Sequence, residues 1–203
     1  MEFKDGTSVY TADGENAGSL HRVVIDPTTR EVTHIVVQKG LLFKEDKVVP
    51  VDKIASTSHE KVDLNCSFEE LKLMSPLEVA HYVPLSESSE GRQNLDPLAG
   101  GMYGGSPSTR NVIMEVKRSI PDELVALKEG ARVVSADDQH VGNIEHVFTE
   151  SETGTVTHFI VTQGLILPTR KTLPIEWVKL ITDDEVYLTV DAQNVEALPV
   201  IQE

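Results

Sequence analysis

The hydrophobic positions of this chain form short runs separated by turn residues, and the runs occur twice. The clearest run is Val-Thr-His-Ile-Val-Val at 32–37, which is followed by Gly-Leu at 40–41. It returns 124 positions later as Val-Thr-His-Phe-Ile-Val at 156–161, followed by Gly-Leu at 164–165. A run that is apolar on both faces is typical of an internal strand in a sheet or barrel.

The two copies align without a gap from Lys4 to Leu64 against Lys128 to Leu188. The positions that coincide carry glycine, proline or apolar residues: Gly6/Gly130, Val9/Val133, Gly18/Gly142, Val23/Val147, Pro50/Pro174 and Val62/Val186. A gapless match that keeps both turn residues and apolar residues indicates the same fold twice.

Alternation and turn chemistry predict several short strands in each copy. In the first copy we expect them at 8–11, 19–25, 32–37, 47–51 and 62–64. Pro50 and Pro174 fall inside strand-like runs and therefore require an edge, a strand start or a bulge. Short strands joined by short turns favour a small antiparallel barrel over a sandwich.

A short helical turn is expected after each set of strands. Ser67 is a suitable cap because acidic residues follow in the first turn, and 191–198 is the counterpart in the second copy. Residues 84–109 are rich in Gly, Ser and Pro and predict a flexible linker, and 111–126 then leads into the second copy as an extended segment. Met102-Tyr103 in the linker fits either a docking motif or an incidental pair.

The predicted fold is therefore mainly β: two small antiparallel β-barrels in tandem, each with a short terminal helix, joined by a flexible linker. The first domain spans 1–74, the linker 75–121 with its flexible part at 84–109, and the second domain 122–203. Each domain is small but lies within the size range of domains that fold alone.

The charge of the chain changes the expected partners. The formal net charge is -15, and residues 122–203 hold most of it, with 15 acids against 5 bases. Such a field repels phosphate backbones, so nucleic-acid binding is not expected. No apolar run is long enough to span a bilayer and the N-terminus lacks the layout of a signal peptide, so the sequence predicts a soluble cytoplasmic protein.

The inventory of reactive residues is small. Cys66 is the only cysteine, so an intramolecular disulfide and a cysteine-rich zinc site are excluded, and its counterpart Val190 predicts a buried apolar position. Gly100 to Gly105 lacks the lysine and flanking elements of a phosphate-binding loop, and no serine lies in a nucleophile elbow. The sequence assigns no catalytic, cofactor-binding or metal residue, and an enzyme is not expected.

The repeated motifs resemble a known family. A glycine before a strand (Gly18, Gly142), the Thr-His-apolar core, the Gly-Leu that follows it and the later Pro50 or Pro174 resemble the PRC-barrel. That domain is found in the cytoplasmic part of the photosynthetic reaction-centre H subunit and in the C-terminal half of a ribosome-maturation factor. The resemblance covers 3–74 and 126–200, is closest to stand-alone tandem PRC-barrel proteins of bacteria, and implies an adaptor or assembly module without catalytic residues.

Two kinds of residue are candidates for contact with a partner. The first are apolar residues that either cap the barrel or are covered by another protein: Leu41, Leu42, Phe43, Leu165, Ile166 and Leu167. The second is Trp177, whose counterpart is Lys53; it is either a binding anchor or a core residue. Positions where the copies differ are better candidates for function than those they share.

His34 and His158 occupy the same place in each copy. Two such histidines could meet across an interface between the barrels and bind a metal or respond to pH. A structural role in an apolar strand is the favoured interpretation, since no His-x-x-x-His or Cys-x-x-Cys spacing supports a metal.

The leading functional hypothesis is a non-enzymatic scaffold that docks protein partners through its two barrels, which pair either within the chain as a pseudo-dimer or between chains as a homodimer. The alternative, by family analogy, is an RNA-processing or ribosome-assembly factor. A third hypothesis is an enzyme or a ligand-binding protein with a site between the barrels, lined by His34, His158 and carboxylates.

Overall fold

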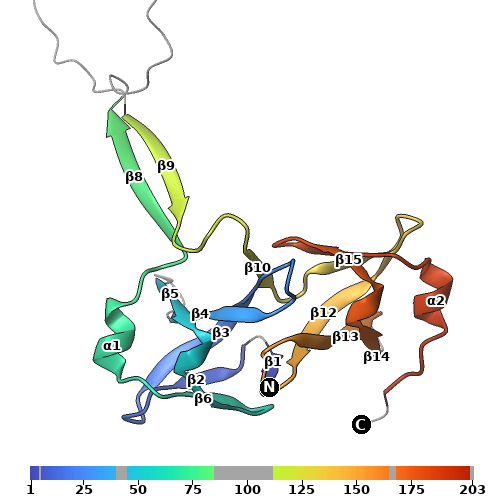
Figure 1. The fold of residues 1–203 in the computed structure, drawn as a ribbon, viewed down its shortest axis with the longest axis horizontal. Coiled ribbons are helices and arrows are strands. Elements are labelled where there is room, and N and C mark those ends of the chain that lie inside the picture. The colour runs from blue at the N-terminus through green and yellow to red at the C-terminus, as the bar shows by residue number, and fades with distance from the viewer. Residues whose placement is uncertain (5, 40–44, 85–111, 165–167, 202–203) are drawn as a thin grey trace, which may run out of the picture. The chain divides into compact units, whose positions relative to one another are not determined.

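The computed structural model describes residues 1–4, 6–39, 45–84, 112–164 and 168–201, and these residues are mainly strands (Figure 1). The first half contains β1 (Glu2–Lys4), β2 (Ser8–Tyr10), β3 (Asn16–Ile25), β4 (Val32–Lys39), β5 (Glu45–Pro50), η1 (Val51–Lys53), β6 (Ile54–Thr57), β7 (Lys61–Leu64) and α1 (Phe68–Leu73). A hairpin of β8 (Glu78–Pro84) and β9 (Val112–Arg118) follows. The second half contains β10 (Val125–Lys128), β11 (Arg132–Val134), β12 (His140–Thr149), β13 (Val156–Gln163), β14 (Thr169–Pro174), η3 (Ile175–Trp177), β15 (Val178–Ile181), β16 (Glu185–Leu188) and α2 (Ala192–Glu196).

The two halves build the same sheet. The strand order is β5-β4-β3-β2-β7-β6 in the first half and β14-β13-β12-β11-β16-β15 in the second. The predicted internal strand 32–37 lies within β4, between β3 and β5, and its repeat within β13 is flanked in the same way. The sequence therefore predicted the repeated β-domain and the internal position of its most apolar strand correctly.

Two details of the predicted barrels differ in the structure. Each sheet contains one parallel pair, β2 with β7 and β11 with β16. The pair is parallel because β7, the second strand of the β6–β7 hairpin, runs in the direction of β2, and β16 of the β15–β16 hairpin runs in the direction of β11. Each sheet is also open in the described part of the chain, since no ladder joins β5 to β6 or β14 to β15. Alternating hydrophobicity identifies strands and their faces but carries no information on strand direction or on closure.

The two sheets exchange strands. β1 pairs antiparallel with β12 of the second sheet, with Phe3 opposite Val147, and β10 pairs antiparallel with β3 of the first sheet, with Leu127 opposite Val23. Phe3 and Leu127 are repeat counterparts, and so are the two pairings. Along one edge, β3 pairs with β2 over part of its length and with β10 of the other half over the rest. In the same way, β12 pairs with β11 and with β1 of the other half.

A pair of turns repeats this two-fold relation. The amide of Val32 donates to the carbonyl of Gly154 at 3.0 Å, and the amide of Val156 donates to the carbonyl of Arg30 at 2.8 Å. Glu31 and Thr155 form the bridge between these contacts. Because counterparts exchange the same hydrogen bonds, the halves are related as the subunits of an isologous dimer are.

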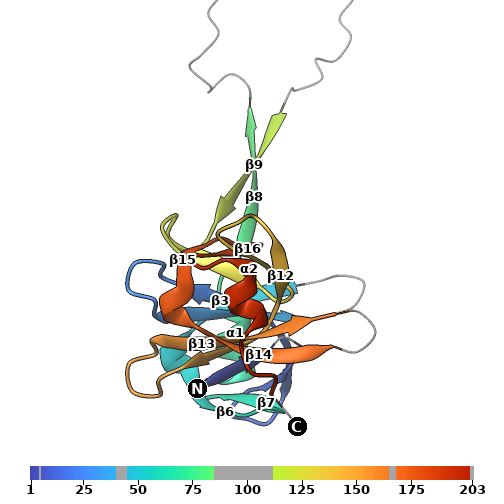
Figure 2. The same cartoon turned by 90° about the vertical axis from the view of Figure 1, so that its right-hand side faces the viewer.

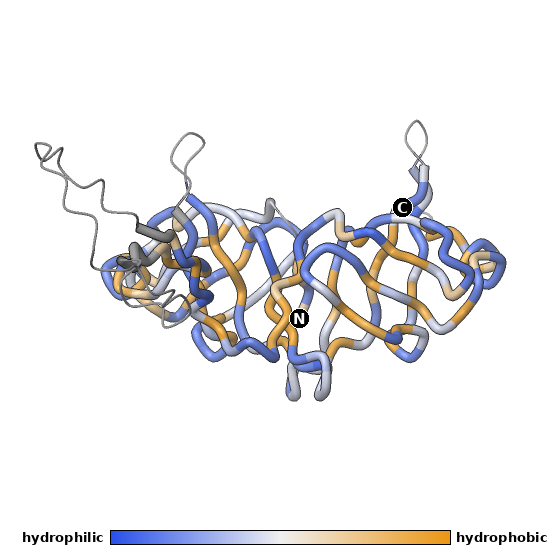
Figure 3. The backbone as a smooth tube through the Cα atoms, turned by 90° about the horizontal axis from the view of Figure 1, so that it is seen from above, coloured by the Kyte–Doolittle hydropathy of each residue, from blue (hydrophilic) through white to orange (hydrophobic). Residues whose placement is uncertain are grey.

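One hydrophobic core extends through both halves. It includes Val9, Ile35 and Leu64 with their respective counterparts Val133, Phe159 and Leu188, and the exchanged Phe3 and Leu127. The predicted burial of Cys66 is confirmed, with 2% of the residue exposed. Figure 3 shows hydrophobic residues concentrated along the strands of both halves and hydrophilic residues in the turns. Among the described residues this cluster joins the two halves in one core, and a second, smaller cluster includes Val24, Val36 and Ala126.

A lysine side chain contacts the C-terminal end of each short helix, and the two lysines are repeat counterparts. Ser67 caps α1 in a capping box with Glu70, as the sequence predicted, and α2 packs on the second sheet through Ala192 and Val195 (Figure 2). Lys47 Nζ donates to the carbonyls of residues 72 and 74 at the end of α1, and Lys171 Nζ donates to those of residues 195 and 196 at the end of α2. Lysine at these positions satisfies carbonyls that a helix end leaves unpaired. None of the helices in the described residues is long and apolar enough to cross a membrane.

The hairpin β8–β9 is a separate compact unit, residues Glu78–Arg118, and it lies within the segment predicted as a linker. Its pairing runs from Glu78 opposite Arg118 to Pro84 opposite Val112. The β-branched residues of this segment explain the pairing. Most of the predicted flexible part, 85–109, lies outside the described residues, and so does Met102-Tyr103.

Candidate functional site

The apolar loops predicted as contact surfaces lie outside the described residues. These are Leu41, Leu42 and Phe43 in the first copy and Leu165, Ile166 and Leu167 in the second. Trp177 is described: it ends η3, is half-buried and packs against the core. Its position is consistent with a core residue, and its role as an anchor stays a prediction.

His34 and His158 occupy matching positions but do not form a common site. Each is half-buried, lies opposite a proline of the neighbouring strand and has its Nδ1 close to the hydroxyl of the preceding threonine, at 3.0 Å for Thr33 and 2.9 Å for Thr157. The ring of His158 also stacks on Phe148 with 4.6 Å between centroids. Among the described residues, no hydrogen bond or ring contact joins His34 to His158. A metal site made from these two histidines therefore has no support in the geometry.

Burial lowers the pKa of His34 and of His158 below the usual range, and the Asp52 carboxylate opposes part of the effect at His34. We expect the free energy of unfolding to decrease as the pH falls below about 6.5, because the unfolded chain then binds protons at these two positions more readily than the folded chain does. The contribution is complete above the unfolded pKa and is lost as the pH falls towards the folded pKa values.

Urea unfolding at pH about 7.5 and about 5.5 tests this expectation when wild type is compared with the His34→Gln/His158→Gln variant. The variant should lose less stability on acidification, since glutamine does not titrate. The same loss in both proteins would show that other groups cause the pH dependence.

A second group of titratable side chains brings the two halves together. Glu2 lies on β1, His146 on β12 and His59 in the turn between β6 and β7 of the first sheet. Glu2 Oε1 is 2.8 Å from His146 Nδ1 and 3.1 Å from His59 Nδ1, and the ligand atoms of all three lie within 4.8 Å of one another. One carboxylate oxygen thus faces two imidazole nitrogens. We call this group the Glu2–His59–His146 cluster.

Burial differs across the Glu2–His59–His146 cluster. The side chain of His146 is 7% exposed, that of Glu2 22% and that of His59 63%, so the cluster extends from the interior to solvent. The rings of His59 and His146 are 5.3 Å apart at a tilt of 46°, which leaves their Nδ1 atoms on a common carboxylate. A small cation could therefore reach the cluster from the side of His59.

The Nε2 atom of His146 lies close to the carboxylate of Glu145, which Arg170 holds in place. Among the described residues, buried His146 Nε2 has no hydrogen-bond partner, and it lies 3.5 Å from Glu145 Oε1. Arg170 holds Glu145 through two contacts, Nε to Oε2 at 2.8 Å and Nη2 to Oε1 at 2.9 Å. Burial raises the pKa of Glu145, but the hydrogen bonds and charge of Arg170 outweigh it, so the pKa is lowered and the carboxylate stays ionised.

The counterpart of this cluster has other chemistry. Counting 124 positions on or back, Ala126 replaces Glu2, Asp183 replaces His59 and Arg22 replaces His146. There the amide of Ala126 donates to Asp183 Oδ1 at 3.0 Å, and Arg22 Nη1 donates to the carbonyl of Ala126 at 3.1 Å. The sequence did not predict this cluster, because only histidines shared by both copies were taken as candidates. Comparison of the two copies for histidines and carboxylates present in one copy alone would have indicated Glu2, His59 and His146.

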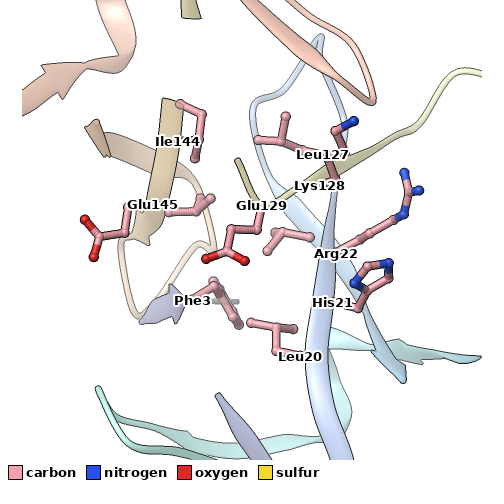
Figure 4. Close-up of a pocket in the computed structure, with 11 residues that line it drawn as sticks. Phe3, Leu20, His21, Arg22, Leu127, Lys128, Glu129, Ile144 and Glu145 are labelled. Carbon is pink, nitrogen blue, oxygen red and sulfur yellow. The ribbon is translucent and has the colours of Figure 1, made fainter. Parts of the chain in front are cut away.

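The pocket between the two halves is lined by counterparts from each. Phe3 and Leu127, and Leu20 and Ile144, line it together with charged groups (Figure 4). Figure 4 shows Arg22 and Lys128 on the side opposite Glu145. Its cavity volume is about 20 Å³, far below the roughly 300–1,000 Å³ of typical small-molecule sites. The pocket is better described as a seam of the core than as a ligand site.

The hairpin unit presents an apolar stripe on one face. Met114 and Val116 are 57% and 48% exposed, and Ala80, which lies opposite Val116, is exposed as well. Glu115 and Lys117 alternate with them along β9 and belong to the other face. Sequence analysis had assigned this segment to the linker and did not consider it as a contact surface; the alternation Met-Glu-Val-Lys at 114–117 was the available signal.

Comparison with known proteins gives one result for the first repeat. Residues 5–64 match the family model of the PRC-barrel domain. No curated protein matches the chain. The second half has the same strand order as the matched segment, 124 positions later.

Proposed function

We propose that this protein, whose residues 5–64 match the family model of the PRC-barrel domain, is a non-enzymatic scaffold that binds other proteins. The observation that carries the proposal is the apolar stripe on the β8–β9 hairpin, formed by Ala80, Met114 and Val116. The charged pair Glu78 and Arg118 borders the stripe at one end of the same face. An exposed apolar patch with a polar rim is typical of a surface that another protein covers.

The low intrinsic stability of a two-stranded hairpin suits this role. A two-stranded ribbon is only marginally stable by itself in water, so a partner that covers one face stabilises it as well as binding it. The unit Glu78–Arg118 has its own compact set of contacts, separate from those of the two sheets. We therefore propose a protein partner with an apolar face, and we expect the ribbon to be the part of the chain that it contacts.

The electrostatics support a protein partner over a nucleic acid. The net charge of -15 repels phosphate groups, and an acidic body also opposes non-specific contact with RNA. A cytoplasmic location is part of the proposal.

Affinity capture from cells of the source organism tests the proposal with two matched variants. Met114→Thr/Val116→Thr removes the apolar stripe and keeps β-propensity, and Glu115→Thr/Lys117→Thr alters the opposite face of the same strand. We expect wild type and the second variant to recover the same protein, and the first variant to recover at least about tenfold less, since about 1.4 kcal/mol of lost binding energy is tenfold in affinity.

Two results would contradict the docking surface. One is equal loss in both variants, which would indicate a damaged hairpin without a specific face. The other is recovery of no protein by the wild-type chain when the same purified chain turns over a small molecule, which would replace the scaffold with an enzyme.

A further inference from the structure

We propose that Glu2, His59 and His146 form a binding site for one divalent transition-metal ion of the zinc class, which joins the two repeats. The donors come from three separate elements: β1, the β6–β7 turn of the first sheet and β12 of the second. The ion would therefore connect the N-terminal strand and the first sheet to the second sheet. This site is independent of the proposed docking face.

The spacing of the donor atoms suits such an ion. Zinc is bound by imidazole nitrogen and carboxylate oxygen at about 2.0–2.2 Å, which puts tetrahedral ligands about 3.4 Å apart. Glu2 Oε1 is 2.8 Å from one imidazole Nδ1 and 3.1 Å from the other. An ion that replaces the two Nδ1 protons needs Glu2 Oε1 to separate from each Nδ1 by a few tenths of an ångström, and needs the donors of the two histidines, which lie within 4.8 Å of each other, to close around it. The exposed ring of His59 can move to meet both conditions.

The surroundings of His146 favour the metal-binding tautomer. When Nδ1 binds an ion, a neutral imidazole carries its proton on Nε2. In His146 that nitrogen is buried, has no hydrogen bond to any residue that the structure describes and lies 3.5 Å from Glu145 Oε1, so the proton would meet a carboxylate. Histidine ligands of metal ions commonly donate their other N–H to such a carboxylate, which orients the ring. Arg170 fixes Glu145 in place through two hydrogen bonds.

The second copy of the junction shows that the fold does not need imidazoles here. At the equivalent place, Arg22, Ala126 and Asp183 connect the exchanged strand to its surroundings by ordinary hydrogen bonds. Both exchanged strands keep the same pairing with the long strand of the other sheet. The Glu-His-His set is therefore a property of one junction only, and the strand exchange does not explain it.

The donor set selects the class of ion. Two imidazoles and one carboxylate suit zinc and its neighbours, whereas magnesium and calcium require mainly oxygen ligands. Three protein ligands leave a coordination position for water, and the 63% exposure of His59 provides access from solvent. The negative field of the chain favours the approach of a cation.

Zinc titration of the untagged full-length chain, after removal of metal with a chelator, tests the site. We expect one Zn²⁺ per chain by calorimetry, and no competition from Mg²⁺ at the same concentration. His59→Gln should weaken Zn²⁺ binding at least about tenfold, and Glu145→Gln, which alters the contact of His146 Nε2, by about 10–100-fold. His140→Gln is the matched control: this histidine contacts Asn143 on the surface and should leave Zn²⁺ affinity unchanged.

A stability measurement provides the second readout. Zn²⁺ at a hundredfold excess over the wild-type Kd should raise the Tm of wild type by about 5–10 °C, and should raise the Tm of His59→Gln by at most about half as much at that concentration. His59 is mostly exposed, so this variant is expected to fold.

The proposal would be overturned by equal Zn²⁺ affinity in wild type and His59→Gln, or by a wild-type chain that neither binds Zn²⁺ nor gains Tm. The latter result would leave Glu2, His59 and His146 as a hydrogen-bonded junction without a metal. Neither result depends on a protein partner, so failure here is distinguishable from failure of the proposed scaffold function.

Discussion

Replacement of Phe3 by alanine is expected to lower the free energy of unfolding by about 3–5 kcal/mol. Phe3 is 1% exposed and lies on β1, where it faces Val147 of the other half of the chain. The substitution leaves a cavity in the core that both halves share, and β1 is too short to be held by its backbone ladder alone. Since domains are stable by only about 5–15 kcal/mol, this single change removes a large fraction of the total.

Urea unfolding of Phe3→Ala, Leu127→Ala and Leu73→Ala measures the effect. Leu127 is the repeat counterpart of Phe3 on β10, and we expect its truncation to cost about 2–5 kcal/mol. Leu73 is 87% exposed and is the control, with an expected change within about 0.5 kcal/mol. A Phe3→Ala chain that unfolds like the Leu73→Ala control would show that the exchanged strand contributes little.

Replacement of Gly142 by alanine is expected to destabilise the chain by about 3 kcal/mol, from backbone strain and from overpacking. Gly142 has φ +140, and an added Cβ would lie 2.6 Å from the carbonyl oxygen of Thr162 on the next strand. Its counterpart Gly18 has φ +121 and its Cβ would clash with the carbonyl of Gln38, so Gly18→Ala should behave alike. Both glycines lie inside a strand next to a β-bulge, where β11 or β2 begins to pair.

Gly130→Ala is the matched control for this prediction. Gly130 also has positive φ, +67, but an added Cβ would meet nothing within 4 Å. Its substitution should therefore cost only the conformational penalty of about 1–2 kcal/mol. Thermal or urea unfolding of Gly142→Ala and Gly130→Ala separates the close approach of the strands from the backbone conformation, and equal losses would contradict the steric argument.

The two proposals concern different parts of the chain. The docking face lies on the hairpin unit, and the Glu2–His59–His146 cluster lies where the two sheets exchange strands. Evidence for one would therefore leave the other open. Metal binding would change the stability of the paired repeats, and removal of the apolar stripe would change recovery of a partner.

The sequence by itself determined the repeated β-domain. Apolar runs such as 32–37 must be covered on both faces, so their place inside a sheet follows from local composition, and their recurrence shows that the fold occurs twice. The Ser67 cap and the burial of Cys66 were likewise readable, since each depends on a few neighbours or on its repeat counterpart.

Only the tertiary structure decided how the repeats combine and where unlike residues meet. The exchanged strand β1 has three residues and therefore no periodicity to detect, and its partner β12 lies more than a hundred positions away. The same distance separates Glu2 from His146, whose contact depends on that exchange. Hydrophobic patterning determines which side of a strand is buried, whereas the partner of an edge depends on the packing of the whole chain.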